Sequence, residues 1–143
     1  MITLYALKKQ GAIPDIYVSQ RERRAIPFIA ALAIYFVGAI ALLWAKAPSI
    51  VTALMLCYVG NSLIMMLITA KWKISIHTSG ITGPATVLIY YFGPTALPFF
   101  LLAIPVAWAR VRLGAHNLAQ VSAGGLLTIL TTYLQLIAYL ALL

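Results

Sequence analysis

Acidic side chains are nearly absent from this chain. Its 143 residues include only Asp15 and Glu22 against ten Lys and Arg, which gives a formal net charge of +8. Oxygen-ligated Mg²⁺ and Ca²⁺ sites need carboxylates, and two acids seven positions apart do not build one of the usual kind. The sequence therefore argues against prenyltransferases with paired aspartates and against metal-dependent kinases. It predicts no metal and no other cofactor.

Cysteine and charged residues of either sign are also scarce. The single cysteine, Cys57, excludes an intrachain disulfide. Charged residues make up 8% of the chain and hydrophobic residues 64%, whereas soluble domains are about a quarter charged and about half apolar. The chain is too apolar for a soluble core. The basic N-terminus precedes a long apolar run without a small-residue cleavage pattern, so we expect no signal peptide.

What the chain has instead is a series of long apolar runs. A helix of about 20 apolar residues crosses the hydrocarbon core of a bilayer. We predict an all-α, polytopic bundle of about five transmembrane spans over residues 26–143, preceded by a basic interfacial segment over residues 1–25. The predicted spans are Ile26–Ala45, Ser49–Ala70, His77–Phe92, Thr95–Ala109 and Asn117–Leu143.

The third and fourth runs differ from the others. Both are short for a full crossing, and Gly93-Pro94 between them would break a helix. They are therefore either spans with deep polar ends or a hairpin embedded in the bundle.

The basic residues support the number of spans. Alternation of five spans places nine of them on one side and only Lys46 on the other, and the positive-inside rule then favours a cytoplasmic N-terminus. Basic residues at span ends meet lipid headgroups and phosphates. We therefore expect a multi-pass protein of the cell membrane, whose partner is the bilayer. We expect no binding to nucleic acid.

Two segments combine histidine with basic residues at the start of an apolar run. Residues 71–80 read Lys-Trp-Lys-Ile-Ser-Ile-His-Thr-Ser-Gly, and residues 110–120 read Arg-Val-Arg-Leu-Gly-Ala-His-Asn-Leu-Ala-Gln. They hold His77 and His116, the only histidines of the chain. Ionisable residues at membrane depth are costly and tend to be functional. The alternative for each histidine alone is a polar residue that caps a helix at the interface.

These residue types in this pattern are suited to phosphoryl transfer. A helix N-terminus offers unpaired N–H groups and a positive dipole end to an anion, and the small residues 78–80 leave room for it. Arg110 and Lys73 can spread charge over phosphoryl oxygens in place of metal ions. One imidazole can attack phosphorus while the other protonates the departing alkoxide. Gln120 lies one turn after His116, so its amide can hold the ring through the second nitrogen.

The two segments resemble motifs of the type 2 phosphatidic acid phosphatase superfamily. Arg110-x5-His116-x3-Gln120 is similar to the third motif, Ser-Arg-x5-His-x3-Asp, and the serine and histidine of Ser75-Ile76-His77 match the second motif, Pro-Ser-Gly-His. The resemblance extends over about residues 71–125. It implies that His116 is the nucleophile that forms a phosphohistidine, that His77 is the general acid and that Arg110 is a phosphate ligand.

Three features depart from the superfamily pattern. The first motif, Lys-x6-Arg-Pro, is absent, Ala109 replaces the serine before the arginine, and Gln120 replaces the aspartate that would orient the nucleophile. A neutral amide fixes a histidine tautomer but stabilises an imidazolium less than a carboxylate does. Lys71 or Lys73 would take the place of the motif lysine. A first helix of the superfamily's usual six would be absent or reduced to residues 1–7.

Two functions from different classes follow. The first is a metal-free phosphatase that hydrolyses a lipid phosphomonoester or diphosphate, of the phosphatidic acid or isoprenoid phosphate type. The alternative is a non-catalytic membrane protein that binds anionic lipid headgroups. The substrate headgroup and tail, the membrane face and the oligomeric state stay open, although the small-residue faces of the last span are suited to pairing of two copies. The predicted catalytic residues are His116, His77 and Gln120, and the predicted phosphate ligands are Arg110, Lys73, Lys71, Ser75 and Arg24.

Overall fold

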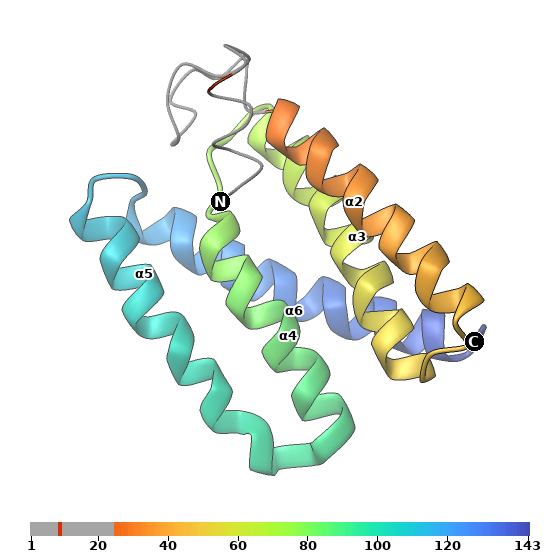
Figure 1. The fold of residues 1–143 in the computed structure, drawn as a ribbon. Coiled ribbons are helices and arrows are strands. Elements are labelled where there is room, and N and C mark those ends of the chain that lie inside the picture. Colours follow the sequence, from red (N-terminus) through yellow and green to blue (C-terminus); the bar gives the residue numbers. More distant parts are fainter. Residues whose placement is uncertain (1–8, 10–24) are drawn as a thin grey trace.

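The computed structural model describes Lys9 and residues 25–143, and the described chain is a bundle of helices (Figure 1). The all-α prediction is confirmed, and the predicted bounds of the first, second and last spans differ from the observed helices by at most three residues. The elements are α2 Ala25–Trp44, α3 Ser49–Thr69, α4 Ile76–Phe92, the 3₁₀-helix η2 Gly93–Leu102, α5 Ala103–Arg112 and α6 Leu118–Leu140.

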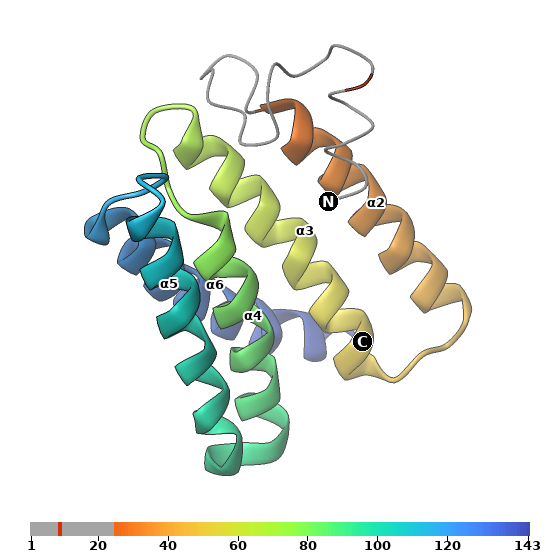
Figure 2. The ribbon, with the colours of Figure 1, turned by 60° about the vertical axis from the view of Figure 1, so that its left-hand side comes forward.

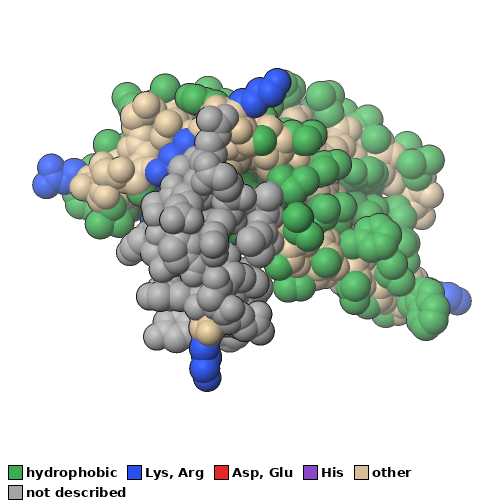
Figure 3. Space-filling view, turned by 90° about the horizontal axis from the view of Figure 1, so that it is seen from above, with side chains coloured by type: hydrophobic (Ala, Val, Ile, Leu, Met, Phe, Trp, Pro, Cys, Tyr) green, Lys and Arg blue, Asp and Glu red, His purple; other side chains and the backbone are tan. Residues whose placement is uncertain are grey.

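Four helical stretches of the described chain are long and apolar enough to cross a membrane. They are Pro27–Trp44, Ser49–Thr69, Ile76–Arg112 and Leu118–Leu140. Hydrophobic side chains cover the flanks of the helices (Figure 3), and Ile104 and Leu126 are 63% and 68% exposed. Monomeric soluble proteins rarely expose such large apolar patches. We therefore treat these surfaces as facing the hydrocarbon region of a bilayer.

The third stretch turns back on itself, which explains the difference between four stretches and five predicted spans. α4 ends at Gly93, whose φ of +73° lies in the left-handed region that favours glycine. η2 then reverses the chain, and α5 returns beside α4 in the opposite direction (Figure 1). Pro94 and Pro98 have no N–H for α-helical bonds, so this segment winds as a 3₁₀-helix. In place of a single run over Thr95–Ala109 the structure has η2 followed by α5, and both alternatives predicted for this pair of runs include such a reversal.

α4 and α6 cross closely through their N-terminal halves. Thr78 Oγ1 donates to Val121 O at 2.9 Å, and Thr82 Oγ1 donates to Gly125 O at 3.2 Å. From the first bond to the second, the residue number increases by four in both helices, which is about one helical turn. The two helices therefore run in the same direction. A Cβ on Gly124 would collide with the backbone at the start of α4. A glycine at the crossing therefore permits this close approach, as small residues do between membrane helices.

A second polar contact joins α3 to α6 in the interior. Asn61 Nδ2 donates to Thr132 Oγ1 at 2.8 Å, and Asn61 Oδ1 accepts from Thr131 Oγ1 at 2.7 Å and from Gln135 Nε2 at 3.1 Å. These partners satisfy an amide that would otherwise be buried without a hydrogen bond. Close to this contact lies a small apolar core, formed by Ala53, Cys57, Val87 and Leu136.

The two ends of the bundle differ in charge. The loop from α3 to α4 and the loop from α5 to α6 lie at one end, and the loop from α2 to α3 lies at the other (Figure 1). Lys71 and Lys73 belong to the first of these loops, and the last turn of α5 carries Arg110 and Arg112. Lys46 lies in the opposite loop. The predicted separation of charges thus holds for these residues, whereas the predicted segment 1–25 lies outside the described residues except for Lys9 and Ala25.

Candidate functional site

The starts of α4 and α6 lie together, and each is capped by a polar side chain. Ser75 Oγ accepts from Thr78 N at 3.4 Å at the start of α4, and Asn117 Oδ1 accepts from Gln120 N at 2.9 Å at the start of α6. The N–H of Ser75 donates to the carbonyl of Gln120 at 3.2 Å and joins the two starts directly. Two positive helix dipole ends therefore meet at one place, and such ends attract anions.

Gln120 fixes the orientation and the tautomer of His116. Gln120 Oε1 lies 3.2 Å from His116 Nδ1 and 3.2 Å from the backbone N of Asn117. A backbone N–H only donates, so the amide atom beside it is the oxygen. An amide oxygen only accepts, so His116 Nδ1 carries the proton and Nε2 carries the lone pair. This geometry leaves Nε2 to act as a base or a nucleophile.

The turn between α5 and α6 holds Arg110 beside His116. The carbonyl of Arg110 accepts from the N–H of Ala115 at 3.1 Å and from the N–H of His116 at 3.2 Å. Gly114 closes the turn with a φ of +63°, a conformation that favours glycine. The Arg-x5-His spacing read from the sequence is therefore a hydrogen-bonded turn that fixes the two residues relative to one another.

The surroundings of His116 keep its imidazole neutral. Burial of the ring lowers the pKa of His116 from its ordinary 6.5 to about 4, because the charged form loses hydration. The hydrogen bond to Gln120 acts in the opposite direction and raises the pKa, whereas the positive charges of Lys73, Arg110 and His77 lower it further. At neutral pH the lone pair on Nε2 is therefore available.

The same electrostatic couplings show which predicted residues share a neighbourhood. Lys73, Arg110 and His77 all act on His116, so the structure brings four of the predicted residues, with Gln120 as a fifth, to one end of the bundle. His77 is the second residue of α4 and is exposed, while Arg110 is half-buried. The remaining predicted ligands are placed differently: Lys71 is exposed in the loop before α4, and Arg24 lies outside the described residues.

Ser75 has a different position from the one expected of a phosphate ligand. Its side chain is fully buried, and its hydroxyl oxygen accepts from the backbone N of Thr78. This position gives Ser75 a structural role at the site, because it starts the helix that carries His77 and donates its N–H to Gln120. It supports a capping function rather than direct contact with phosphate.

Sequence reasoning missed two residues that shape the site, Asn117 and Thr78. Asn117 and Gln120 form a capping box, in which each side chain accepts from the other residue's backbone N–H. The Asn-x-x-Gln spacing before an apolar run was a readable signal for it. Thr78 joins α4 to α6 through Val121 O, and no local pattern indicates such an interhelical bond.

Within the described part of the chain, no group of three or more His, Cys, Asp or Glu side chains is placed to hold a metal ion. That the chemistry needs no metal stays a prediction, and so does the resemblance to the phosphatase superfamily. A scan against models of known families, a search of characterised proteins and a search of solved structures found no match for this chain.

Proposed function

We propose that this protein is a membrane phosphatase that hydrolyses a lipid phosphomonoester or diphosphate through a phosphohistidine on His116. The observation that carries the proposal is the contact between His116 Nδ1 and Gln120 Oε1, with the amide orientation set by the N–H of Asn117. It leaves an unprotonated Nε2 at the joined starts of two helices, beside Arg110. A neutral imidazole with a fixed tautomer is the state that a nucleophilic histidine needs.

The proposed reaction has two steps. In the first, the lone pair on His116 Nε2 attacks phosphorus, the bond from phosphorus to the lipid oxygen breaks, and His77 donates a proton to that departing oxygen. In the second, a water attacks the phosphohistidine, the P–N bond breaks, and His77 takes a proton from the water. Inorganic phosphate leaves, and Nε2 regains its lone pair.

The charges of the phosphoryl group have several candidate partners in this geometry. The N-termini of α4 and α6 point their positive dipole ends at one place, and Arg110 and Lys73 are near enough to act on His116. A guanidinium can bind two phosphoryl oxygens at once. Lys71, in the loop before α4, is a further proposed ligand. Arg24 is another, and it lies outside the described residues.

The test is release of inorganic phosphate from a panel of lipid phosphates by the purified protein in detergent, with EDTA present. We expect release by the wild type and a loss of at least about a thousandfold in His116→Ala. Asn117→Ala serves as a matched control, because it removes the cap of the same helix but not the imidazole. Activity of His116→Ala near that of the wild type would remove His116 as the nucleophile.

Gln120 also favours a second candidate, a protein that binds anionic headgroups without turnover. Its amide carries no charge to stabilise an imidazolium, and its side-chain oxygen already accepts from the backbone N–H of Asn117 at the helix start. This candidate expects binding to vesicles that contain phosphatidic acid, weaker at high salt, and no phosphate release. Release of phosphate by the purified wild type would exclude it.

A further inference from the structure

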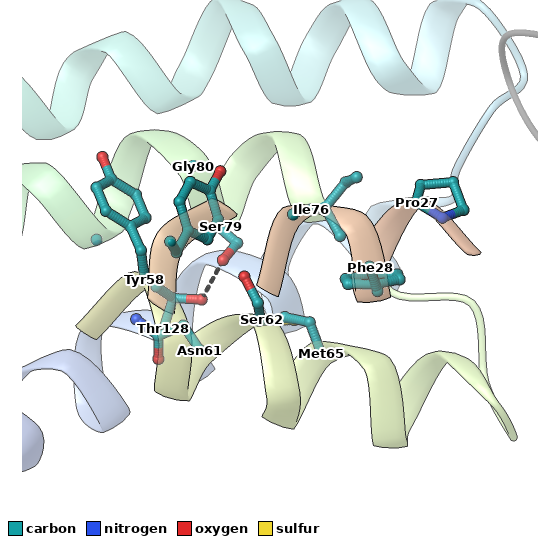
Figure 4. A pocket seen from close by; sticks show the side chains of 13 residues that line it. Pro27, Phe28, Tyr58, Asn61, Ser62, Met65, Ile76, Ser79, Gly80 and Thr128 are labelled. Carbon is teal, nitrogen blue, oxygen red and sulfur yellow. Dashed lines mark hydrogen bonds between the residues drawn. The ribbon is translucent and has the colours of Figure 1, made fainter. Parts of the chain in front are cut away.

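A cavity of about 190 Å³ lies inside the half of the bundle that carries the site (Figure 4). α2 and α4 form its sides, and α3 and α6 close it. Its wall contains the first turns of α2 and α4 and the C-terminal half of α3. The lining residues are Pro27, Phe28, Ala31, Tyr35, Tyr58, Asn61, Ser62, Met65, Ile76, Ser79, Gly80, Gly83 and Thr128.

The main polar groups in this wall have partners in the protein. The hydroxyls of Ser79 and Thr128 lie 2.7 Å apart, as Figure 4 shows. The amide of Asn61 is bonded to Thr131 and Thr132 on α6. Aromatic and aliphatic side chains, among them Phe28, form much of the remaining wall. Within a membrane such a space is suited to hydrocarbon, because its wall is chiefly apolar.

The cavity begins one helical turn from the proposed general acid. Gly80 lines it, and His77 lies three positions earlier on α4, so the two are neighbours on the helix surface. A Cβ on Gly80 would meet nothing within 4 Å. A side chain there would extend into open space at a position that lines the cavity.

α2 forms the outer wall of the cavity, and α3 is the helix on which it chiefly packs. It packs along α3, with stacked rings of Tyr35 and Tyr58 whose centroids are 5.2 Å apart. No comparable packing joins α2 to α4 or α6 among the described residues, and Figure 2 shows α2 on the outer side of α3. Among the described residues, the side of the cavity between α2 and α4 is therefore less closely packed than the side between α2 and α3.

We propose that this cavity binds the headgroup-proximal part of one hydrocarbon chain of the substrate lipid, and that Gly80 determines whether the chain enters. This rests on the proposed function, since the chain enters from a phosphate held at His77 and His116. A cavity of about 190 Å³ has room for a short segment of one hydrocarbon chain. Gly80 is thus a specificity residue for the lipid tail.

Gly80→Leu tests the proposal with two substrates, hexadecyl phosphate and butyl phosphate, in the same detergent. The leucine fills the open space, so we expect KM for hexadecyl phosphate to rise about tenfold, the effect of excluding about two methylenes. The kcat/KM for butyl phosphate should fall less than that for hexadecyl phosphate, because its chain is too short to need the cavity. Ser122→Leu, an equal bulk on an exposed position of α6, should leave both substrates unaffected.

An equal loss on both substrates, or no loss on hexadecyl phosphate, would overturn the chain site. A second measurement does not need turnover: a hexadecyl phosphate that carries a photoreactive diazirine in the first part of its chain is irradiated with His116→Ala protein. We expect labelling of cavity residues such as Tyr58 and Phe28, and its loss when Gly80→Leu is added. Labelling without any wild-type hydrolysis would reject the proposed function and keep the chain site, whereas labelling elsewhere would reject the chain site alone.

Discussion

At the scale of single residues, the proposed site depends on one residue, Gln120, that contacts the starts of two helices. Gln120 accepts from Asn117 N and His116 Nδ1 through its side chain, and from Ser75 N through its carbonyl. The His116–Gln120 pairing could be predicted from a spacing of four on one helix. The bond to Ser75 could not, because it depends on how two helices far apart in the sequence are placed.

Substitutions of Gln120 distinguish its effect on the orientation of the His116 ring from the effect of a negative charge beside that ring. Gln120→Glu keeps the capping box and places a carboxylate on His116 Nδ1, which raises the pKa of His116 and stabilises the imidazolium of the transition state. We expect kcat to rise about tenfold, the effect of about 1.4 kcal/mol. Gln120→Leu removes the acceptor and should lower kcat by at least about tenfold. Steady-state phosphate release measures both, and equal kcat in all three proteins would contradict the role of Gln120.

The lowered pKa of His116 sets the acid limb of activity. The pKa is about 4, chiefly because the ring is buried, with Lys73, Arg110 and His77 adding to the effect. Nε2 is therefore unprotonated above about pH 4. On the acid side, kcat/KM should begin to fall only as the pH approaches this value. In Lys73→Gln the limb should move to higher pH, because one positive charge is removed. An acid limb near pH 6.5 in the wild type would contradict the surroundings described for His116.

The same shift affects stability in a defined direction. The pKa of His116 is lower in the folded state than in the unfolded state, so the unfolded state binds more protons between about pH 6.5 and pH 4. The contribution of His116 is therefore complete above pH 6.5 and decreases as the pH falls toward 4. His116→Gln should show a smaller decrease of unfolding temperature over this range than the wild type.

At the scale of helices, close packing of α4 on α6 places the two histidines together. The apolar length of each span and the break at Gly93-Pro94 could be read from the sequence, because both are local. The 3₁₀ winding of η2 was missed, although Pro94 and Pro98 are visible in the sequence. Close helix packing at Gly124-Gly125 could be expected from two adjacent glycines. Its partner α4 could not, because small residues do not say which helix packs on them.

Gly124→Ala tests this crossing. A Cβ there collides with Ser75 O and lies 2.8 Å from Thr78 Oγ1, so α4 must move away from α6. We expect a loss of about 1–3 kcal/mol in unfolding free energy and a matching fall in activity. Gly125→Ala is the control, since its Cβ lies 3.5 Å from Thr82 Cγ2 in ordinary contact. Equal stability of the two variants in detergent unfolding would contradict the close crossing.

At the scale of the whole molecule, Asn61 connects α3, on which α2 packs, to α6 of the site. Asn61→Leu leaves Thr131, Thr132 and Gln135 on α6 without this partner. We expect a loss of about 1–2 kcal/mol, the upper range for polar contacts between membrane helices. Ser62→Leu, at the next position of α3, should change the unfolding free energy less. Denaturation in mixed SDS micelles measures both, and a larger loss in Ser62→Leu would refute the role given to Asn61.

The arrangement of the whole bundle brings together the features on which the proposed function depends. The basic loops, the two helix starts and the cavity beside Gly80 all lie in the same half of the molecule. A lipid in the bilayer would place its phosphate at the joined helix starts and its chain below them. The charge separation was predictable from the alternation of spans, while the cavity was not, since it is formed by four helices at once.

The most direct test of the proposed chemistry is trapping of the phosphoenzyme. Wild type and His77→Ala are mixed with a phosphorus-labelled lipid phosphate in EDTA, quenched under alkaline conditions that preserve phosphohistidine, and mapped by mass spectrometry. Our account predicts label on Nε2 of His116 in the wild type. In His77→Ala the label should form and disappear more slowly, because the first step lacks its acid and the second step lacks its base. Release of phosphate without label on His116, or label on another residue, would contradict it.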